Sequence, residues 1–171
     1  MISGSGDEKI VMSEIVTRQH EATFEAHTGA VYVLAVSGRT LLSAGDDCTI
    51  GVWALGTWSH LKLVRVSEHV PDCERCNFLA MSGSMLLCGG MCKDDELCED
   101  DDESCEDNDG FVVVLDINSL TCQHTLQFDH SVEVLRSVRD EVWGRLWSNS
   151  VVVWGKAEQG EESGMREAGR A

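Results

Sequence analysis

The sequence contains little proline, no long apolar run and few basic residues. One proline occurs in 171 residues. No stretch of 18 or more apolar residues exists, which excludes a membrane-spanning helix. Residues Met1 to Asp7 lack the basic and apolar segments of a cleavable signal peptide, so we expect no export by means of such a signal. Hydrophobic residues still make up 43% of the chain, which excludes wholesale disorder and is enough for a folded domain.

Positive charge is scarce and negative charge is concentrated in one segment. The chain has 13 Lys and Arg against 30 Asp and Glu, for a formal net charge of −17. Residues 91–108 contain ten of the carboxylates and one lysine, and therefore carry more than half of that net charge. This balance repels nucleic acid backbones and anionic membranes, and we expect neither as a partner. It favours basic proteins, cations or simply solubility.

Cysteine is abundant, but its context argues against a disulfide framework. The eight cysteines occur in a chain of ordinary size with no export signal. Reduced thiols are the usual state in the cytosol and the nucleus. We therefore expect an intracellular protein, cytoplasmic or nuclear.

Short apolar segments with alternating polarity, typical of β-strands, recur along the chain. In the first group, predicted strands follow His27 at residues 31–36, 41–43, 49–53 and 61–66. The same order recurs after His69 and, in a shorter form, after His130. Since no segment shows a clear helical apolar face, the sequence predicts an all-β fold.

The spacing of the copies indicates a repeat with one insertion. His27 and His69 are 42 residues apart, His69 and His130 are 61 apart, and residues 91–108 account for nearly all of the excess. Long insertions in loops cost little closure entropy. The predicted boundaries are a disordered N-terminus at 1–9, a folded region at 10–155 with repeats at about 24–66, 67–127 and 128–155, an acidic insertion loop at 91–108, and a disordered tail at 156–171.

The period and strand order resemble the tryptophan–aspartate (WD) repeat, whose units of about 40–45 residues form four-stranded propeller blades. The best match runs from His27 to Trp53 and includes Ser43 and Asp47. The resemblance implies that these four residues form a buried hydrogen-bonded tetrad. Such a network is tolerated in a core because every polar atom has a partner.

The other two copies depart from this pattern. In the second copy, Cys88 and Leu115 stand where the serine and the tryptophan of the first copy stand. In the third, Gly144 replaces the serine and Ser148 replaces the aspartate. The resemblance implies three four-stranded antiparallel blades. Because a closed propeller needs four to eight blades, we expect an incomplete or open propeller, with self-association or a second chain as ways to complete the ring.

The resemblance also implies a function, since WD-repeat proteins usually serve as scaffolds or adaptors. We expect a non-enzymatic module that binds other proteins, with no cofactor, because no nucleophile elbow or phosphate-binding glycine loop is found. The candidate partner-binding residues are Asp100, Asp101, Asp102, Glu103 and Trp147. The acidic four would attract a basic segment, whereas a solvated loop without a specific role is the alternative. Trp147 is an aromatic of the kind found in binding hot spots, with blade packing as its alternative.

A cysteine-based metal or redox function is the second hypothesis. Cys73 and Cys76 have the spacing of a ligand pair, and Cys92 and Cys98 lie in the acidic segment. Four thiolates suit zinc, although a zinc site usually has two close pairs and the second is missing here. A redox disulfide and simple reduced thiols remain open beside zinc.

Overall fold

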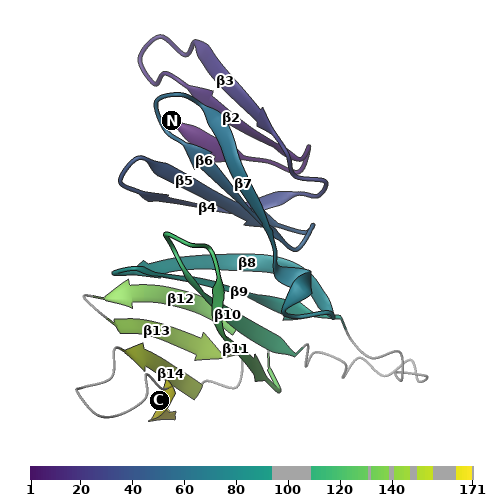
Figure 1. The fold of residues 1–171 in the computed structure, drawn as a ribbon, viewed down its shortest axis with the longest axis vertical. Helices are drawn as coiled ribbons and strands as arrows, with labels where there is room; N and C mark the ends of the chain where they lie inside the picture. Colours follow the sequence, from purple (N-terminus) through teal and green to yellow (C-terminus); the bar gives the residue numbers. More distant parts are fainter. Residues whose placement is uncertain (94–108, 131, 139–140, 147–149, 156–164, 171) are drawn as a thin grey trace. The chain divides into compact units, whose positions relative to one another are not determined.

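A computed structural model of the chain describes residues 1–93, 109–130, 132–138, 141–146, 150–155 and 165–170 (Figure 1). The regular elements among them are strands β1 to β15 and one short 3-10 helix, η1. The strands form four antiparallel sheets, one of three strands and three of four. The predicted all-β fold of open, propeller-like blades is confirmed. In the part of the chain that the structure describes, no helix is long and apolar enough to cross a membrane.

The chain divides into two compact units, Met1–Leu79 and Ala80–Ala171. The first contains a complete four-stranded sheet, with the strands in sequence order. These strands are β4 (Val31–Ser37), β5 (Thr40–Gly45), β6 (Thr49–Ala54) and β7 (Ser59–Arg65). Almost every residue of β5 and β6 is buried, which is the pattern of strands covered on both faces. These are the strands predicted for the first repeat.

A three-stranded sheet precedes it and corrects the prediction for the N-terminus. Residues 1–9 were predicted to be disordered, but they contain β1 (Ile2–Gly4), which pairs with β2 (Lys9–Ser13), and β2 pairs with β3 (His20–Glu25). A Cβ atom on Gly4 would lie 2.7 Å from Val31 Cγ1, so this close approach requires glycine. The glycines and serines that favour disorder in the sequence are therefore compatible with a strand here.

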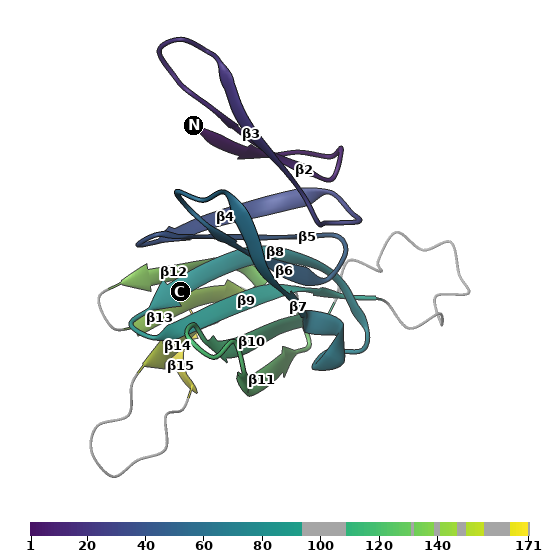
Figure 2. The ribbon, with the colours of Figure 1, turned by 45° about the horizontal axis from the view of Figure 1, so that its top comes forward.

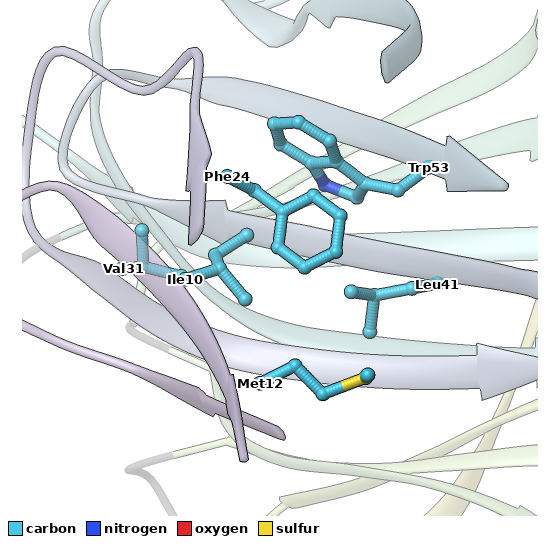
Figure 3. Close-up of a cluster of buried hydrophobic side chains, with 6 residues drawn as sticks. All are labelled: Ile10, Met12, Phe24, Val31, Leu41 and Trp53. Carbon is cyan, nitrogen blue, oxygen red and sulfur yellow. The ribbon is translucent and has the colours of Figure 1, made fainter. Parts of the chain in front are cut away.

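The core of the first unit lies between these two sheets (Figure 3). Ile10, Met12 and Phe24 pack against Val31, Leu41 and Trp53. The rings of Phe24 and Trp53 meet edge to face, with centroids 5.2 Å apart, a favoured aromatic geometry. On the opposite face of the three-stranded sheet, Lys9 forms an ion pair with Glu25 at 2.9 Å, and both side chains are exposed. Alternation along β2 and β3 thus buries one face only.

The next sheet corresponds to the predicted second repeat. After η1 (Val66–Glu68), the chain forms β8 (Cys73–Ser82), β9 (Met85–Cys92), β10 (Gly110–Asp116) and β11 (Cys122–Phe128). The acidic segment joins β9 to β10, and its residues 94–108 lie outside the described residues. Strand β10 is buried along most of its length.

The last sheet has the four strands that the WD-repeat resemblance implied, but its fourth strand lies beyond residue 155, the predicted end of the third repeat. It comprises β12 (Val132–Val138), β13 (Glu141–Leu146), β14 (Ser150–Gly155) and β15 (Met165–Arg170), and β15 pairs with β14 (Figure 2). Residues 165–170 were predicted as part of a disordered tail, and that prediction is wrong for them. Residues 156–164 lie outside the described part of the chain. The short third repeat is thereby completed to four strands.

Candidate functional site

The four residues of the implied tetrad meet inside the β4–β7 sheet. His27 Nδ1 lies 2.9 Å from Asp47 Oδ2 and its Nε2 lies 2.6 Å from Ser43 Oγ. Trp53 donates its indole N–H to the same hydroxyl oxygen at 2.9 Å. One arrangement of protons satisfies all three bonds: Nδ1–H donates to the carboxylate, and the hydroxyl donates to Nε2. His27, Ser43 and Trp53 are at most 6% exposed.

Asp47 is the hub of this network. Its carboxylate also accepts hydrogen bonds from the Thr28 N–H at 3.0 Å and from the Thr49 hydroxyl at 2.8 Å. Burial alone would raise the pKa of the Asp47 carboxyl, but the hydrogen bonds from His27, Thr28 and Thr49 outweigh it and lower the pKa. Thr28 and Thr49 were not anticipated from the sequence. The turn between β5 and β6 is consequently fastened to the start of β4.

Gly51 is a second residue that the sequence reasoning missed. A Cβ atom there would lie 2.6 Å from Ser43 Oγ, 2.8 Å from Trp53 Nε1 and 3.0 Å from His27 Nε2. Any side chain would therefore displace the network. The signal was present in the sequence, since glycine is unusual in the interior of a buried strand and marks a close approach.

The β8–β11 sheet has the same register without the network. Cys88 pairs with Val113 as Ser43 pairs with Gly51, and Leu86 pairs with Leu115 as Leu41 pairs with Trp53. Cys88, Val113 and Leu115 are fully buried. His69, which the spacing suggested as the histidine of this copy, is exposed at the end of η1. In the last sheet, Gly144 and Trp154 hold the register positions of Ser43 and Trp53.

An exposed tyrosine lies next to the turn that the tetrad fixes. Tyr32 is 54% exposed and donates its hydroxyl to Asp46 Oδ2 at 2.8 Å. The pairing of β4 with β5 shifts between Val31 and Val33, so Tyr32 occupies a β-bulge, a feature that often re-aims a side chain. Asp46 directly precedes Asp47 in the turn. The buried network thus positions the acceptor that holds the exposed ring.

Two charged residues at the start of β8 complete this surface, which we call the Tyr32 patch: Tyr32, Asp46, Glu74 and Arg75. Arg75 Nη2 bonds Glu74 Oε1 at 2.7 Å, and this hydrogen bond is the main reason that the pKa of Arg75 is raised. Arg75 also interacts electrostatically with Asp46 and Tyr32. The hydrogen bond to Asp46, more than any other cause, raises the pKa of the Tyr32 hydroxyl. The phenol therefore keeps its proton, and with it the hydrogen-bond donor, to a higher pH than an ordinary tyrosine does.

The structure does not test the partner-binding residues predicted from the sequence. Asp100 to Glu103 and Trp147 lie outside the described residues, as does Cys98. Cys73 and Cys76 come together with their Sγ atoms 4.0 Å apart, and Cys92 is buried near the end of β9. Within the described ranges, no group of three or more His, Cys, Asp or Glu is placed to hold a metal ion. The described residues thus give a close thiol pair and no zinc cluster.

Comparison with known proteins supports the fold. No family model matches the chain, and no curated protein has a matching sequence. Among solved structures, U3-55K, a WD40 protein, is similar with a TM-score of 0.70 at 16% identity over 97% of this chain. Dihydro-heme d1 dehydrogenase NirN, a propeller protein, has a TM-score of 0.72 at 16% identity over 99%. The matches span 47% and 34% of those two chains, so this chain covers less than half of either. The chain has a β-propeller-like fold.

Proposed function

We propose that this chain is a non-enzymatic interaction module of the WD-repeat type, which binds other proteins through the Tyr32 patch. The observation that carries the proposal is the exposed Tyr32 ring, hydrogen-bonded to a turn that a buried network holds in place. The His–Ser–Asp–Trp network and the similarity to a WD40 protein support the WD-repeat assignment.

The patch has the chemistry of a binding hot spot. Tyrosine offers a large contact area with a polar tip, and it loses little conformational entropy on binding when it is already fixed. Tyr32 is fixed by Asp46, which is adjacent to the buried Asp47. Sites whose side chains are locked by a supporting shell bind more tightly than loose ones. The patch therefore meets a partner with its aromatic anchor already in place.

The charge around the patch favours a partner with a basic segment. Asp46 and Glu74 contribute two carboxylates against the single guanidinium of Arg75, and the chain as a whole carries −17. Such a surface attracts basic segments and speeds encounter with them at low salt. The acidic residues Asp100 to Glu103 would add to this attraction. Their neutralisation is expected to flatten the salt dependence of binding.

Quantitative affinity capture from cell extract tests the proposal, with Tyr32→Ala compared with Val36→Ala. Val36 is a matched control because it lies on the same strand and is 53% exposed, against 54% for Tyr32. We expect Tyr32→Ala to reduce the bound amount of specific partners by roughly tenfold or more, the size typical of a hot-spot truncation. Val36→Ala is expected to capture them as the wild type does. Equal capture by both variants would overturn the role of the patch.

A further inference from the structure

A pair of buried thiols lies at the edge of the Tyr32 patch. Cys73 Sγ and Cys76 Sγ are 4.0 Å apart, and the two residues are 6% and 0% exposed. Cys48 donates its S–H to the Cys73 carbonyl oxygen at 3.0 Å, which fixes the backbone at the start of β8. Two sulfurs already in van der Waals contact need to move by only about 2 Å to reach the length of a disulfide bond.

The two cysteines flank two residues of the Tyr32 patch in the sequence. Glu74 and Arg75 are the residues between Cys73 and Cys76. Because disulfide geometry fixes the separation and orientation of both Cβ atoms, bond formation must change the backbone of the two residues in between. That change displaces the Glu74–Arg75 pair relative to Tyr32 and Asp46, with which Arg75 interacts electrostatically.

We propose that Cys73 and Cys76 form a reversible redox site, oxidised by a low-molecular-weight disulfide such as glutathione disulfide, and that the Cys73–Cys76 bond weakens partner binding at the Tyr32 patch. The second half rests on the function proposed above. The reduced form described here is the binding form. The partner is thus held under reducing conditions and released under oxidising ones.

The chemistry proceeds by two thiol–disulfide exchanges. The Cys73 thiolate, the slightly more accessible of the two, attacks one sulfur of the oxidant, whose S–S bond breaks and releases one thiol. The Cys76 thiolate then attacks Cys73 Sγ, which releases the second thiol and forms the intramolecular S–S bond. The protein loses two electrons and two protons, and the oxidant takes up both as two thiols. A short bridge that distorts its backbone is readily reduced again, as regulatory disulfides are.

Peptide mapping tests the site directly, without a partner. The full chain is treated with glutathione disulfide, denatured in the presence of excess alkylating agent so that buried thiols are also capped, and cut with trypsin. Cleavage after Arg75 separates Cys73 from Cys76, so a disulfide between them leaves two peptides joined and is recognised by fragmentation in the mass spectrometer. We expect this linkage in the wild type and in Cys122→Ser, a control at a half-buried cysteine, and its loss in Cys76→Ser. Retention of the linkage in Cys48→Ser would confirm that Cys48 is not the partner of Cys73. Alkylation of both Cys73 and Cys76 after oxidation would overturn the proposal.

A tyrosine label tests the effect on the patch. Tyr32 is the only tyrosine of the chain, so ¹³C-tyrosine gives ring signals from this residue alone. Oxidation is expected to shift these signals in the wild type and to leave them in place in Cys76→Ser. Partner capture should fall at least about threefold on oxidation of the wild type, but not of Cys76→Ser. If the disulfide forms while the ring signals and capture stay unchanged, the regulatory role is wrong. If reduced Tyr32→Ala captures partners normally, the function proposed above fails instead, and the mapping result still decides the redox site.

Discussion

Two sheets of this molecule pair their strands in the same register but have different side chains at the equivalent positions. These side chains form a polar network in one sheet and an apolar core in the other. The equivalent residues are Ser43 and Cys88, Gly51 and Val113, and Trp53 and Leu115. In the β4–β7 sheet they support a hydrogen-bonded network that includes a histidine and an aspartate. In the β8–β11 sheet they are all apolar in character and fully buried. Both arrangements are compatible with burial. The polar atoms of the first sheet have hydrogen-bond partners, and the second sheet has almost no polar side-chain atoms that need one.

The difference between the sheets shows what the polar network adds. Apolar packing is not directional, so it stabilises a sheet without fixing a particular turn. The hydrogen bonds of His27 and Asp47 are directional, and they fasten the β5–β6 turn to the start of β4. Asp46 belongs to that turn, and its carboxylate accepts the hydrogen bond from the Tyr32 hydroxyl. Within the proposed Tyr32 patch, the network therefore supports Tyr32 and Asp46, whereas Glu74 and Arg75 come from β8 of the other sheet.

Alanine at the glycine and valine positions gives the largest predicted losses of stability. Gly51→Ala is expected to lower the free energy of unfolding by about 2–3 kcal/mol, because its methyl group would overlap Ser43, Trp53 and His27. Val113→Ala, at the equivalent position, should cost about 1–2 kcal/mol from lost burial. Urea titration followed by tryptophan fluorescence measures both. A neutral or stabilising Gly51→Ala, as glycine replacement in a strand usually gives, would break the comparison.

Removal of the central hydroxyl has a smaller predicted effect. Ser43→Ala leaves the Trp53 N–H and His27 Nε2 without their buried partner, at an expected cost of about 2 kcal/mol. Cys88→Ala removes one sulfur from an apolar site and should cost about 1 kcal/mol. The same urea titrations report both values. Equal losses in the two variants would mean that the network contributes no more than ordinary packing.

Much of this fold follows from the sequence, and particular residues show where prediction stops. The strand order was readable because Val31 to Val36 and Phe111 to Leu115 are uninterrupted apolar runs. The tetrad followed from the family resemblance. Strand β1 was missed because Ile2-Ser3-Gly4 has a disordered composition, and its pairing with β2 depends on tertiary context. The sequence of β15 is equally polar.

The candidate site was only partly predictable for a geometric reason. Tyr32 occupies a predicted strand, and an apolar run does not reveal that a bulge frees its side chain. Its acceptor Asp46 directly precedes the tetrad residue Asp47, and only the fold shows that the Asp46 carboxylate accepts the Tyr32 hydroxyl. Arg75 reaches the patch from 43 residues further along the chain, a long-range contact that local patterns do not encode.

Acid sensitivity is the smallest of the stability effects that we predict. The pKa of Asp47 is lowered in the folded protein, so the stabilisation it provides is complete above its ordinary unfolded pKa of about 3.9 and is lost as the pH falls through the lower folded value. The urea midpoint of the wild type should therefore fall as the pH is lowered below about 4. Asp47→Asn, which has no charge to titrate there, should show a shallower fall. If the urea midpoints of the wild type and Asp47→Asn fall equally with pH, Asp47 does not account for the acid sensitivity.

The central claim is that the buried network holds Asp46 in place for Tyr32, and the pKa of this single tyrosine tests it most directly. With ¹³C-tyrosine, the ring signals of Tyr32 are followed as the pH is raised, in the wild type, Asp46→Asn and His27→Ala, with Ser43→Ala as a milder change. The wild-type pKa should lie above the ordinary value of about 10. Asp46→Asn should lower it toward that value, and both network variants should move it in the same direction. A lowered pKa in Asp46→Asn with a wild-type pKa in folded His27→Ala and Ser43→Ala would contradict the account.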